Sequence, residues 1–369
     1  MSEFDFGGGV HPERCACGAC LGGPVRLAGN VDGQGGRING RAVWTAGEAA
    51  VHLNRTAFPE ETDAGPGWSN AGLDARPASG DPAVLRFGFH SQATMDASAY
   101  FDATLEYDGF QPFSAAQEAA ARKAVLLWND LVAIDIVETA ADQADLTFGN
   151  YDNRPGTQAY AYLPYNYSAP ETEFAGDVWI NVEQDDNLEL DNGFYGLHVL
   201  VHETGHSLGL TQPGDYDAGD GGPINYPGSA EYYQDSRQYT LMSYFNAEFT
   251  GAGHVDWGRF VWVYGQTPLL HDILAIQTIY GADPTTRTGA TVYGFNGNAG
   301  RDVFDFALNT MPVISIYDAE GIDTLDFSGW DTPSTIDLNP GAFSSGGGSG
   351  IVPLAVLKAA GQSPAATTA

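Results

Sequence analysis

Two histidines and a glutamate stand at a spacing that could bind a metal ion and activate water. His202, Glu203 and His206 form the pattern H-E-x-x-H within a stretch that favours a helix. Histidines four positions apart lie on one face of a helix, so both imidazoles could hold a single zinc ion. Glu203 could then act as the general base toward a water molecule on that metal. Two helix histidines without a metal are the alternative for so short a pattern.

The residues that follow extend this pattern. Gly209, three positions after the second histidine, lets the chain leave the helix sharply because glycine adopts backbone angles that other residues avoid. Met242, in the run Leu-Met-Ser-Tyr, could form an apolar floor beneath the metal or could simply belong to the core. Together these features resemble the metzincin proteases, whose pattern is H-E-x-x-H-x-x-G-x-x-H followed by a methionine turn.

The position at which that pattern requires a third histidine holds Gln212. The flanking residues Gly209 and Pro213 are as expected, so a shifted alignment does not explain the difference. Glutamine offers a neutral carbonyl oxygen, which is a weaker zinc ligand than imidazole. Three accounts compete: Gln212 coordinates zinc with reduced affinity, the site recruits another ligand, or the change leaves an inactive protein. The candidates for recruitment are Tyr244, Asp215, Asp217 and a cysteine.

Helices and strands must hold these residues in place. The apolar run before the motif predicts a buried helix over residues 197–210. A second helix is expected over 114–131, with Ser114 as its N-cap and Gln117 completing a capping box. A third is expected over 269–280. Short strands are predicted at 83–89, 134–137, 144–148, 177–182, 291–295, 313–317, 324–327 and 335–338.

These elements predict an α+β protein in four parts. Residues 1–40 are glycine-rich and predict a flexible leader or pro-segment. Residues 41–285 are expected to form a metzincin-type catalytic domain, with a twisted mixed sheet, the motif helix and the methionine turn. Residues 286–343 favour a short β-rich segment, and 344–369 a low-complexity tail.

Composition limits the classes of partner. The net charge of −32, from 15 Lys and Arg against 47 Asp and Glu, argues against binding nucleic acid or an anionic membrane. No segment approaches the roughly 18 apolar residues of a membrane span. The first residues, Met-Ser-Glu-Phe-Asp-Phe, lack the basic and apolar regions of a cleavable secretion signal. Export by a route without such a signal remains open.

Further blocks resemble the serralysins, calcium-containing zinc proteases that bacteria export by type I secretion. The similar blocks are 145–151, 156–162, 176–179, 272–277, 286–289, 292–295 and 318–328. The resemblance implies zinc on His202 and His206, with Glu203 as the base that activates water. It also implies that Tyr244 lies near the metal, as an extra ligand or as a hydrogen-bond donor to the oxyanion.

The same resemblance implies the partners and the location of the protein. The substrates would be proteins or peptides, which could pair with an exposed strand near 147–151 or 159–162. We expect a secreted, extracellular bacterial protein, monomeric, with neither nucleic acid nor membrane as a partner.

Structural calcium is a further implication. The implied donors are backbone oxygens, a hydroxyl and acidic side chains at Arg287, Gly289, Thr291, Asp318, Glu320, Gly321 and Asp323. Glu320 stands where the family usually has glycine. The nonapeptide repeats that bind more calcium in this family find no convincing match, so we expect a chain that was truncated before them or lacks them.

The cysteines form one short cluster, Cys15, Cys17 and Cys20. Because thiolates bind zinc well, this part of the leader could occupy the open metal position and keep an enzyme latent. A surface thiol group with one local disulfide and a separate three-thiolate metal site are the alternatives.

The sequence therefore predicts a zinc-dependent endopeptidase in which Glu203 is the general base and Gln212 lowers the activity. Two alternatives remain. The first is a catalytically weak or inactive metzincin-fold protein that binds polypeptides. The second is a latent zymogen held by its cysteine-containing leader.

Overall fold

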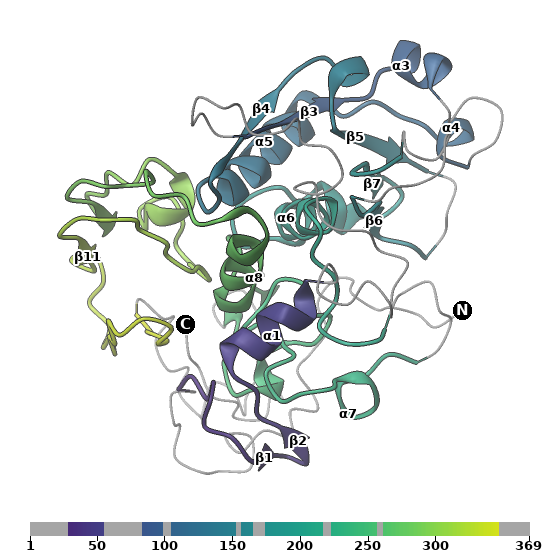
Figure 1. Cartoon of the computed structure of the whole chain (residues 1–369). Helices are drawn as coiled ribbons and strands as arrows, with labels where there is room; N and C mark the ends of the chain where they lie inside the picture. Colours follow the sequence, from purple (N-terminus) through teal and green to yellow (C-terminus); the bar gives the residue numbers. More distant parts are fainter. Residues whose placement is uncertain are drawn as a thin grey trace, which may run out of the picture.

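The motif helix lies at the centre of the molecule, between a mixed sheet and a second group of helices (Figure 1). The computed structural model describes residues 29–54, 83–98, 105–152, 156–164, 174–216, 223–256 and 261–346. The predicted α+β class, with a mixed sheet followed by a β-rich segment, is confirmed. No helix in these ranges is both long enough and apolar enough to span a membrane.

The main sheet has five strands in the order β4-β3-β5-β7-β6. Four of them are parallel, and β6 pairs antiparallel with β7 at the edge. Their bounds are β3 (Ala83–Phe89), β4 (Ile134–Glu138), β5 (Leu146–Tyr151), β6 (Ala159–Ala161) and β7 (Val178–Asn181). Because β5 lies between β3 and β7, residues 147–151 are not an exposed edge strand, and that alternative is wrong. Of the two predicted segments, the one at an edge of the described sheet is β6, and β4 lies at the opposite edge.

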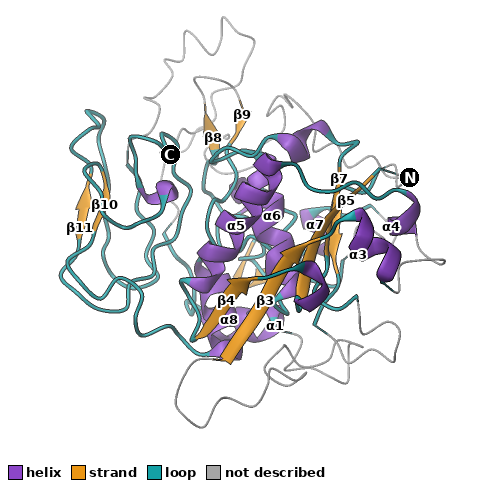
Figure 2. Cartoon of the chain, turned by 90° about the horizontal axis from the view of Figure 1, so that it is seen from above, coloured by secondary structure: helices purple, strands orange, loops and turns teal. Residues whose placement is uncertain are grey.

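Two long helices lie side by side along one side of this sheet (Figure 2). Helix α5 (Ala115–Asn129) begins at Ser114, whose hydroxyl accepts from Gln117 N in the predicted capping box. Helix α6 (Tyr195–Ser207) carries the motif, and every one of its residues is buried. The Trp128 indole N–H donates to Val201 O at 2.9 Å and fastens α5 to α6. This hydrogen bond helps to hold the motif helix against α5.

The second group of helices lies on the other side of α6. Helix α8 (Leu270–Tyr280) packs against α1 (Ala46–Leu53). The remaining elements are α3 (Gln92–Ala97), α4 (Leu105–Asp108), α7 (Tyr226–Ser229), β8 (Val255–Asp256), β9 (Val261–Trp262), and the 3₁₀ turns Ala141–Gln143, Asp185–Leu188, Ala247–Phe249 and Asp302–Phe304.

The end of the predicted flexible leader is docked on the molecule. Strands β1 (Arg37–Ile38) and β2 (Arg41–Ala42) form a hairpin whose turn residues, Asn39 and Gly40, have φ of 49° and 83°. Positive φ at both positions is the geometry that an Asn-Gly hairpin turn supplies. The following Trp44 ring stacks on Tyr232 at 4.1 Å between centroids. Residues 29–40 therefore differ from the flexible chain that their glycine content predicts.

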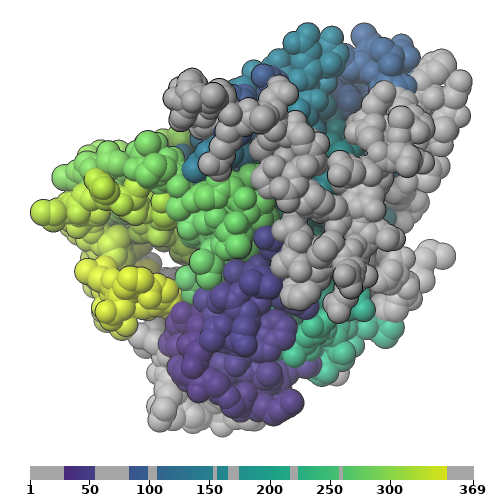
Figure 3. All heavy atoms as spheres, viewed as in Figure 1, coloured from purple at the N-terminus to yellow at the C-terminus, as the bar shows by residue number. Residues whose placement is uncertain are grey.

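The β-rich segment forms the green-to-yellow lobe at one side of the molecule (Figure 3). Strands β10 (Val292–Gly294) and β11 (Thr324–Asp326) pair in parallel. Residues 313–317 do not form the predicted strand, since Val313 N and Ser315 N donate to the side chains of Gln266 and Thr267 instead. Of the strand predicted at 335–338, only a bridge from Thr335 to Ser345 is present.

Candidate metal and catalytic site

His202, Glu203 and His206 lie on α6 and are almost completely shielded from solvent. The three residues are 7%, 7% and 8% exposed, respectively. The two imidazole ring centroids lie 4.7 Å apart and their planes are nearly perpendicular, at 82°. This proximity follows from the spacing of four, which places the two side chains one above the other on the helix.

Backbone carbonyls fix the orientation of both rings. His202 Nδ1 lies 2.8 Å from Leu241 O, and His206 Nδ1 lies 2.8 Å from Leu210 O. A carbonyl can only accept, so each Nδ1 carries the proton and each Nε2 keeps its lone pair. Burial, followed by the neighbouring His206 and His198, holds the pKa of His202 well below its usual range. Neutral imidazoles with Nε2 directed outward are the form that binds a metal ion.

Gly209 returns the chain to the site after the helix ends. Its φ of 109° is a conformation that residues with a Cβ rarely adopt. The turn brings Gln212 to the histidines, where its Nε2 lies 3.1 Å from His206 Nε2. The same Nε2 donates to the Tyr244 hydroxyl at 3.1 Å. The Gln212 amide therefore lies between His206 and Tyr244, with its nitrogen toward the imidazole ring.

Met242 lies beneath the helix and is fully buried. A Cβ added to Gly205 would come within 3.0 Å of Met242 Sδ and 2.9 Å of the Trp128 ring. Only glycine fits at that position without displacing one of these side chains. The methionine thus packs under the turn of α6 that joins the two histidines.

The turn that contains Met242 is held by a buried carboxylate on α8. Asp272 accepts hydrogen bonds from Thr240 Oγ1 at 2.5 Å and from Leu241 N at 2.7 Å. Leu241 O in turn accepts from His202 Nδ1, so one residue links α8 to the first histidine. Burial raises the pKa of Asp272 to about 6. The sequence signal for this role is the place of Asp272 in the first turn of a predicted helix, where it also accepts from Leu269 N at 2.8 Å.

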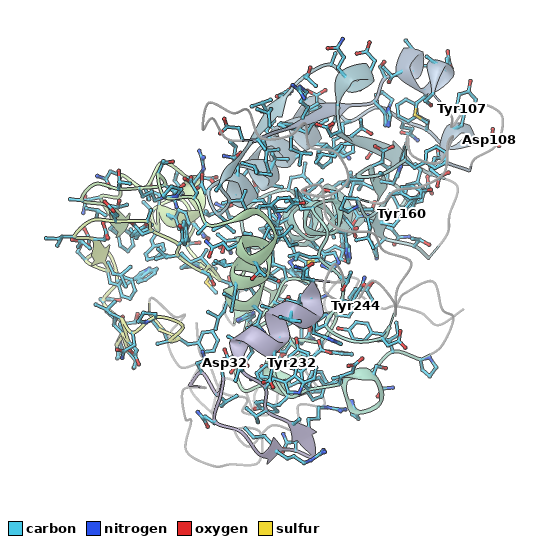
Figure 4. All side chains as sticks on the ribbon, in the orientation of Figure 1. Asp32, Tyr107, Asp108, Tyr160, Tyr232 and Tyr244 are labelled. Carbon is cyan, nitrogen blue, oxygen red and sulfur yellow. The ribbon has the colours of Figure 1, made fainter. Side chains whose placement is uncertain are left out.

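Tyr244 follows the methionine turn and lies beside the histidines. Its ring centroid is 6.1 Å from that of His202 and 5.2 Å from that of Tyr216. Figure 4 shows Tyr244 below α6, with Tyr160 of the edge strand β6 above it.

A third histidine of α6, His198, lies one turn before the pair, with its ring centroid 6.1 Å from that of His202. It packs against the Tyr264 ring at 5.3 Å, and its buried Nδ1 has no hydrogen-bond partner. Asp215 is exposed. In the ranges that the structure describes, no three His, Cys, Asp or Glu side chains are grouped to hold a metal. Asp217 and the cluster Cys15, Cys17 and Cys20 lie outside the described residues.

Several predicted calcium ligands meet at one point of the β-rich segment. Gly321, with φ of 135°, packs so closely that an added Cβ would lie 2.0 Å from Gly289 O and 2.9 Å from Asp323 Oδ1. Thr291 N donates to Asp323 Oδ1 at 2.9 Å. Glu320 is exposed at the surface of the same loop. The structure therefore gathers a backbone oxygen and a carboxylate around Gly321.

Asp318 and Arg287, two further predicted ligands, make other contacts. Asp318 Oδ2 accepts from the Tyr293 hydroxyl at 2.6 Å, whereas Asp318 Oδ1 is buried without a hydrogen-bond partner. The Arg287 side chain turns away and pairs with Asp130 at the end of α5. Carboxylate and backbone oxygens are the donors that calcium prefers, and a buried unpartnered carboxylate oxygen suits a cation.

Comparisons with known proteins find similarity over most of the chain. A family model described as the serralysin C-terminal domain of peptidase M10 matches residues 282–357. Serralysin G of Dickeya chrysanthemi is 39% identical over 277 residues, which are 73% of this chain and 54% of that protein. Metalloprotease AprA of Pseudomonas entomophila (strain L48) is 35% identical over 326 residues, or 87% and 62%. Serralysin A of D. chrysanthemi is 38% identical over 324 residues, or 86% and 61%. The chain thus spans between half and two thirds of the length of these curated relatives.

Proposed function

This chain is serralysin-like, and from that premise we propose that it is a zinc-dependent endopeptidase that hydrolyses peptide bonds in proteins. One observation carries the proposal most directly. Two buried imidazoles, each with Nδ1 bonded to a backbone carbonyl, keep their Nε2 lone pairs free of protons on the helix that also carries the buried Glu203. Neutral, oriented histidines beside a carboxylate are suited to hold zinc and to move a proton.

In this proposal, the residues of the chain orient the substrate and move protons. A bound zinc ion would supply Lewis-acid activation of water and polarisation of the scissile carbonyl. Glu203 accepts the proton of the attacking water and passes it to the leaving amine. Tyr244 donates a hydrogen bond to the oxygen on which negative charge develops.

Gln212 is our proposed third ligand. Its Nε2 donates to Tyr244 and faces His206 Nε2. A half-turn of the amide about its last side-chain bond would exchange the nitrogen for Oε1, which can coordinate a cation. The amide oxygen is neutral and harder than imidazole, so we expect weaker zinc binding than three histidines provide.

The edge strand β6 is the proposed docking site for the substrate backbone. It pairs with β7 on one side only among the strands described, and it packs against α6. An extended peptide can add to such an edge through main-chain hydrogen bonds. This arrangement would carry the scissile bond past the motif helix.

The oxygen cluster of Gly289, Asp318 and Asp323 is proposed to bind structural calcium. The buried, unpartnered Asp318 Oδ1 supports this assignment, and so does the position of Gly289 O and Asp323 Oδ1 against the same glycine, Gly321. We further propose a secreted, extracellular protein, because calcium at about millimolar levels suits weak extracellular sites.

Restoring histidine at position 212 tests the zinc assignment. We expect Gln212→His to raise the zinc affinity at least about tenfold, since imidazole is the better ligand. Zinc affinity is measured by competition with a chromophoric chelator, and casein hydrolysis is measured with and without o-phenanthroline. The full chain and a form lacking residues 1–28 are compared, which separates a latent zymogen from an open enzyme.

The outcomes distinguish the alternatives. Hydrolysis that appears only after removal of residues 1–28 favours the zymogen. An unchanged zinc affinity in Gln212→His contradicts Gln212 as the weak ligand. Zinc-loaded Gln212→His without hydrolysis in either form contradicts the protease and favours a protein that only binds polypeptides.

A further inference from the structure

The segment before the methionine turn contains a buried carboxylate that the proposed mechanism does not use. Asp235 is fully buried. Its Oδ1 accepts from the Ser243 hydroxyl at 2.7 Å and from the Tyr216 hydroxyl at 2.9 Å. Its Oδ2 is buried without a hydrogen-bond partner. Such a group is costly to bury, so its contacts deserve a functional explanation.

Both donors to Asp235 are neighbours of Tyr244. Ser243 directly precedes it in the chain, and the Tyr216 ring packs on the Tyr244 ring at 5.2 Å. The two donors come from different segments, one from the methionine turn and one from the chain that follows Gln212. Asp235 therefore joins the two segments that supply Tyr244 and Gln212.

The Ser243 hydroxyl shows how the carboxylate acts on the backbone. Phe245 N donates to Ser243 Oγ at 3.1 Å, which closes a tight turn around Tyr244. A hydroxyl can donate only one hydrogen bond, and Ser243 donates its hydrogen bond to Asp235. The lone pairs of Ser243 Oγ are therefore directed toward Phe245 N. Without the carboxylate, the hydroxyl could rotate and the turn would lose this bond.

A neighbouring arginine holds the same turn. Arg237 N donates to Phe245 O at 2.8 Å, and Arg237 Nε donates to Ser243 O at 3.2 Å. Residues 235–237 thus contact the chain on both sides of Tyr244. The ring of Tyr244 extends from this clamp to the Gln212 amide, with Tyr216 packed against it.

We propose that Asp235 is a positioning residue, which holds the Tyr244 hydroxyl at the site through Ser243 and Tyr216. The proposal rests on the proposed function for the role of Tyr244 in hydrolysis. Its geometric part concerns only where Tyr244 lies, so it can be tested without any activity.

A double-mutant cycle on the full chain tests the kinetic part. Asp235→Ala should lower kcat about tenfold with little change in KM, because it weakens a contact to the oxyanion rather than to the ground state. In a Tyr244→Phe background, the same substitution should have almost no further effect on kcat. Asp235→Asn keeps an amide oxygen that can accept from both hydroxyls, as Asp235 Oδ1 does, and should recover most of the loss.

Thr250→Val is the matched control. The substitution removes a buried hydroxyl that lies 2.6 Å from Oγ of Ser236, the residue next to Asp235. The Thr250 hydroxyl has no hydrogen bond to Ser243 or Tyr216. We expect a similar loss of stability and an unchanged kcat. If Asp235→Ala lowers kcat equally in the Tyr244→Phe background, or if Thr250→Val lowers it as much, the positioning role is wrong.

Crystal structures supply the readout that needs no activity. In Asp235→Ala, the contact between Tyr244 Oη and Gln212 Nε2 should lengthen beyond hydrogen-bond distance, and in Thr250→Val it should stay. If Asp235→Ala does not fold, Tyr216→Phe replaces it, because that variant keeps the ring and removes only one donor. If Tyr244 has not moved in the variant, the positioning role is wrong. If Tyr244 has moved in the variant but the parent hydrolyses no protein, the positioning role stands and only the proposed protease function is wrong.

Discussion

At the residue scale, single side chains around the two histidines decide how the site is built. His202 and His206 owe their shared orientation to two backbone carbonyls, and one of these, Leu241 O, is itself held through Asp272. His202 and Asp272, which supports its carbonyl partner, are therefore far apart in sequence and joined in space. A substitution of His202 would remove a metal-binding side chain in the proposed site, whereas a substitution of Asp272 would only loosen the support of that side chain.

Replacement of Asp272 should weaken metal binding without touching a ligand. Asp272→Asn turns an amide toward donors at Thr240, Leu241 and Leu269, so at least one hydrogen bond is lost. We expect a loss of about 1–3 kcal/mol in the free energy of unfolding and about tenfold in zinc affinity. Urea unfolding and chelator competition measure the two effects.

Glu48→Gln is the control for Asp272→Asn, because Glu48 belongs to an exposed capping box on α1. It should leave zinc affinity unchanged. Equal zinc affinities in Asp272→Asn and the parent would show that the hydrogen bond to His202 does not depend on α8.

Stability should fall as pH rises toward neutrality because of Asp235. Burial raises its pKa to about 7, above the ordinary value of 3.8, and this outweighs the opposing hydrogen bonds from Ser243 and Tyr216. The folded state therefore binds more protons than the unfolded state, so stability declines between about pH 4 and 7. The other groups that influence Asp235 are Glu231 and Arg41.

The measurement for this effect is the melting temperature at pH 5 and at pH 8. Asp235→Asn cannot ionise, so its melting temperature should fall less than that of the parent over this interval. An equal fall in both proteins would show that other groups cause the pH dependence.

At the element scale, α6 can pack closely because it carries a glycine where it meets Met242 and Trp128. Gly205→Ala adds a Cβ into that contact and should cost about 1–3 kcal/mol of unfolding free energy through overpacking. Gly47→Ala, on the exposed side of α1, is the same substitution and should stabilise by about 0.5–1 kcal/mol. Urea unfolding of both variants checks the contrast. Equal effects would mean that the packing beneath α6 is looser than these distances indicate.

Elements with local causes were predictable from the sequence. The strand at 83–89 and the capping box at Ser114 depend on neighbouring residues, and both are observed as predicted. The edge strand β6 was left as one of two possibilities, because which strand ends a sheet depends on distant pairings. The strand expected at 313–317 was wrong for a similar reason, since side chains of Gln266 and Thr267 take its N–H groups.

The candidate site also contains residues that the sequence predicts and residues that only distant contacts reveal. The motif residues of α6 follow from a spacing that sequence displays directly. Asp272 has a local signal, its place in the first turn of a predicted helix, but its contact with the methionine turn is distant in sequence. Asp235 carries no pattern that distinguishes it from the many acidic residues of the surface. Their roles required the packed structure.

At the scale of the whole molecule, the β-rich segment is joined to α5 by charge. Asp130 accepts from both Arg287 and Arg301, and Arg287 also donates to Tyr317 O at 3.0 Å. Arg287 lies two residues before Gly289, whose carbonyl belongs to the proposed calcium cluster. Calcium and this ion pair should therefore stabilise the same junction.

Removal of calcium should lower the melting temperature, because a ligand that binds only the folded state stabilises it. Asp323→Ala should abolish the difference between calcium and a calcium chelator. Asp331→Ala, an exposed acidic residue of the same segment, should keep it. A calcium response that survives in Asp323→Ala would place the cation elsewhere, and scanning calorimetry distinguishes these results.

The central claim is that Glu203 activates water on a zinc ion held by the histidines of α6. The most direct measurement is casein hydrolysis by zinc-loaded parent and Glu203→Gln proteins, with the zinc content of each determined in the same samples. We predict hydrolysis by the parent and a loss of about 10²–10⁴-fold in Glu203→Gln at equal zinc content. Equal rates in the two proteins, or a parent that binds zinc at the histidines and hydrolyses nothing, would contradict the account.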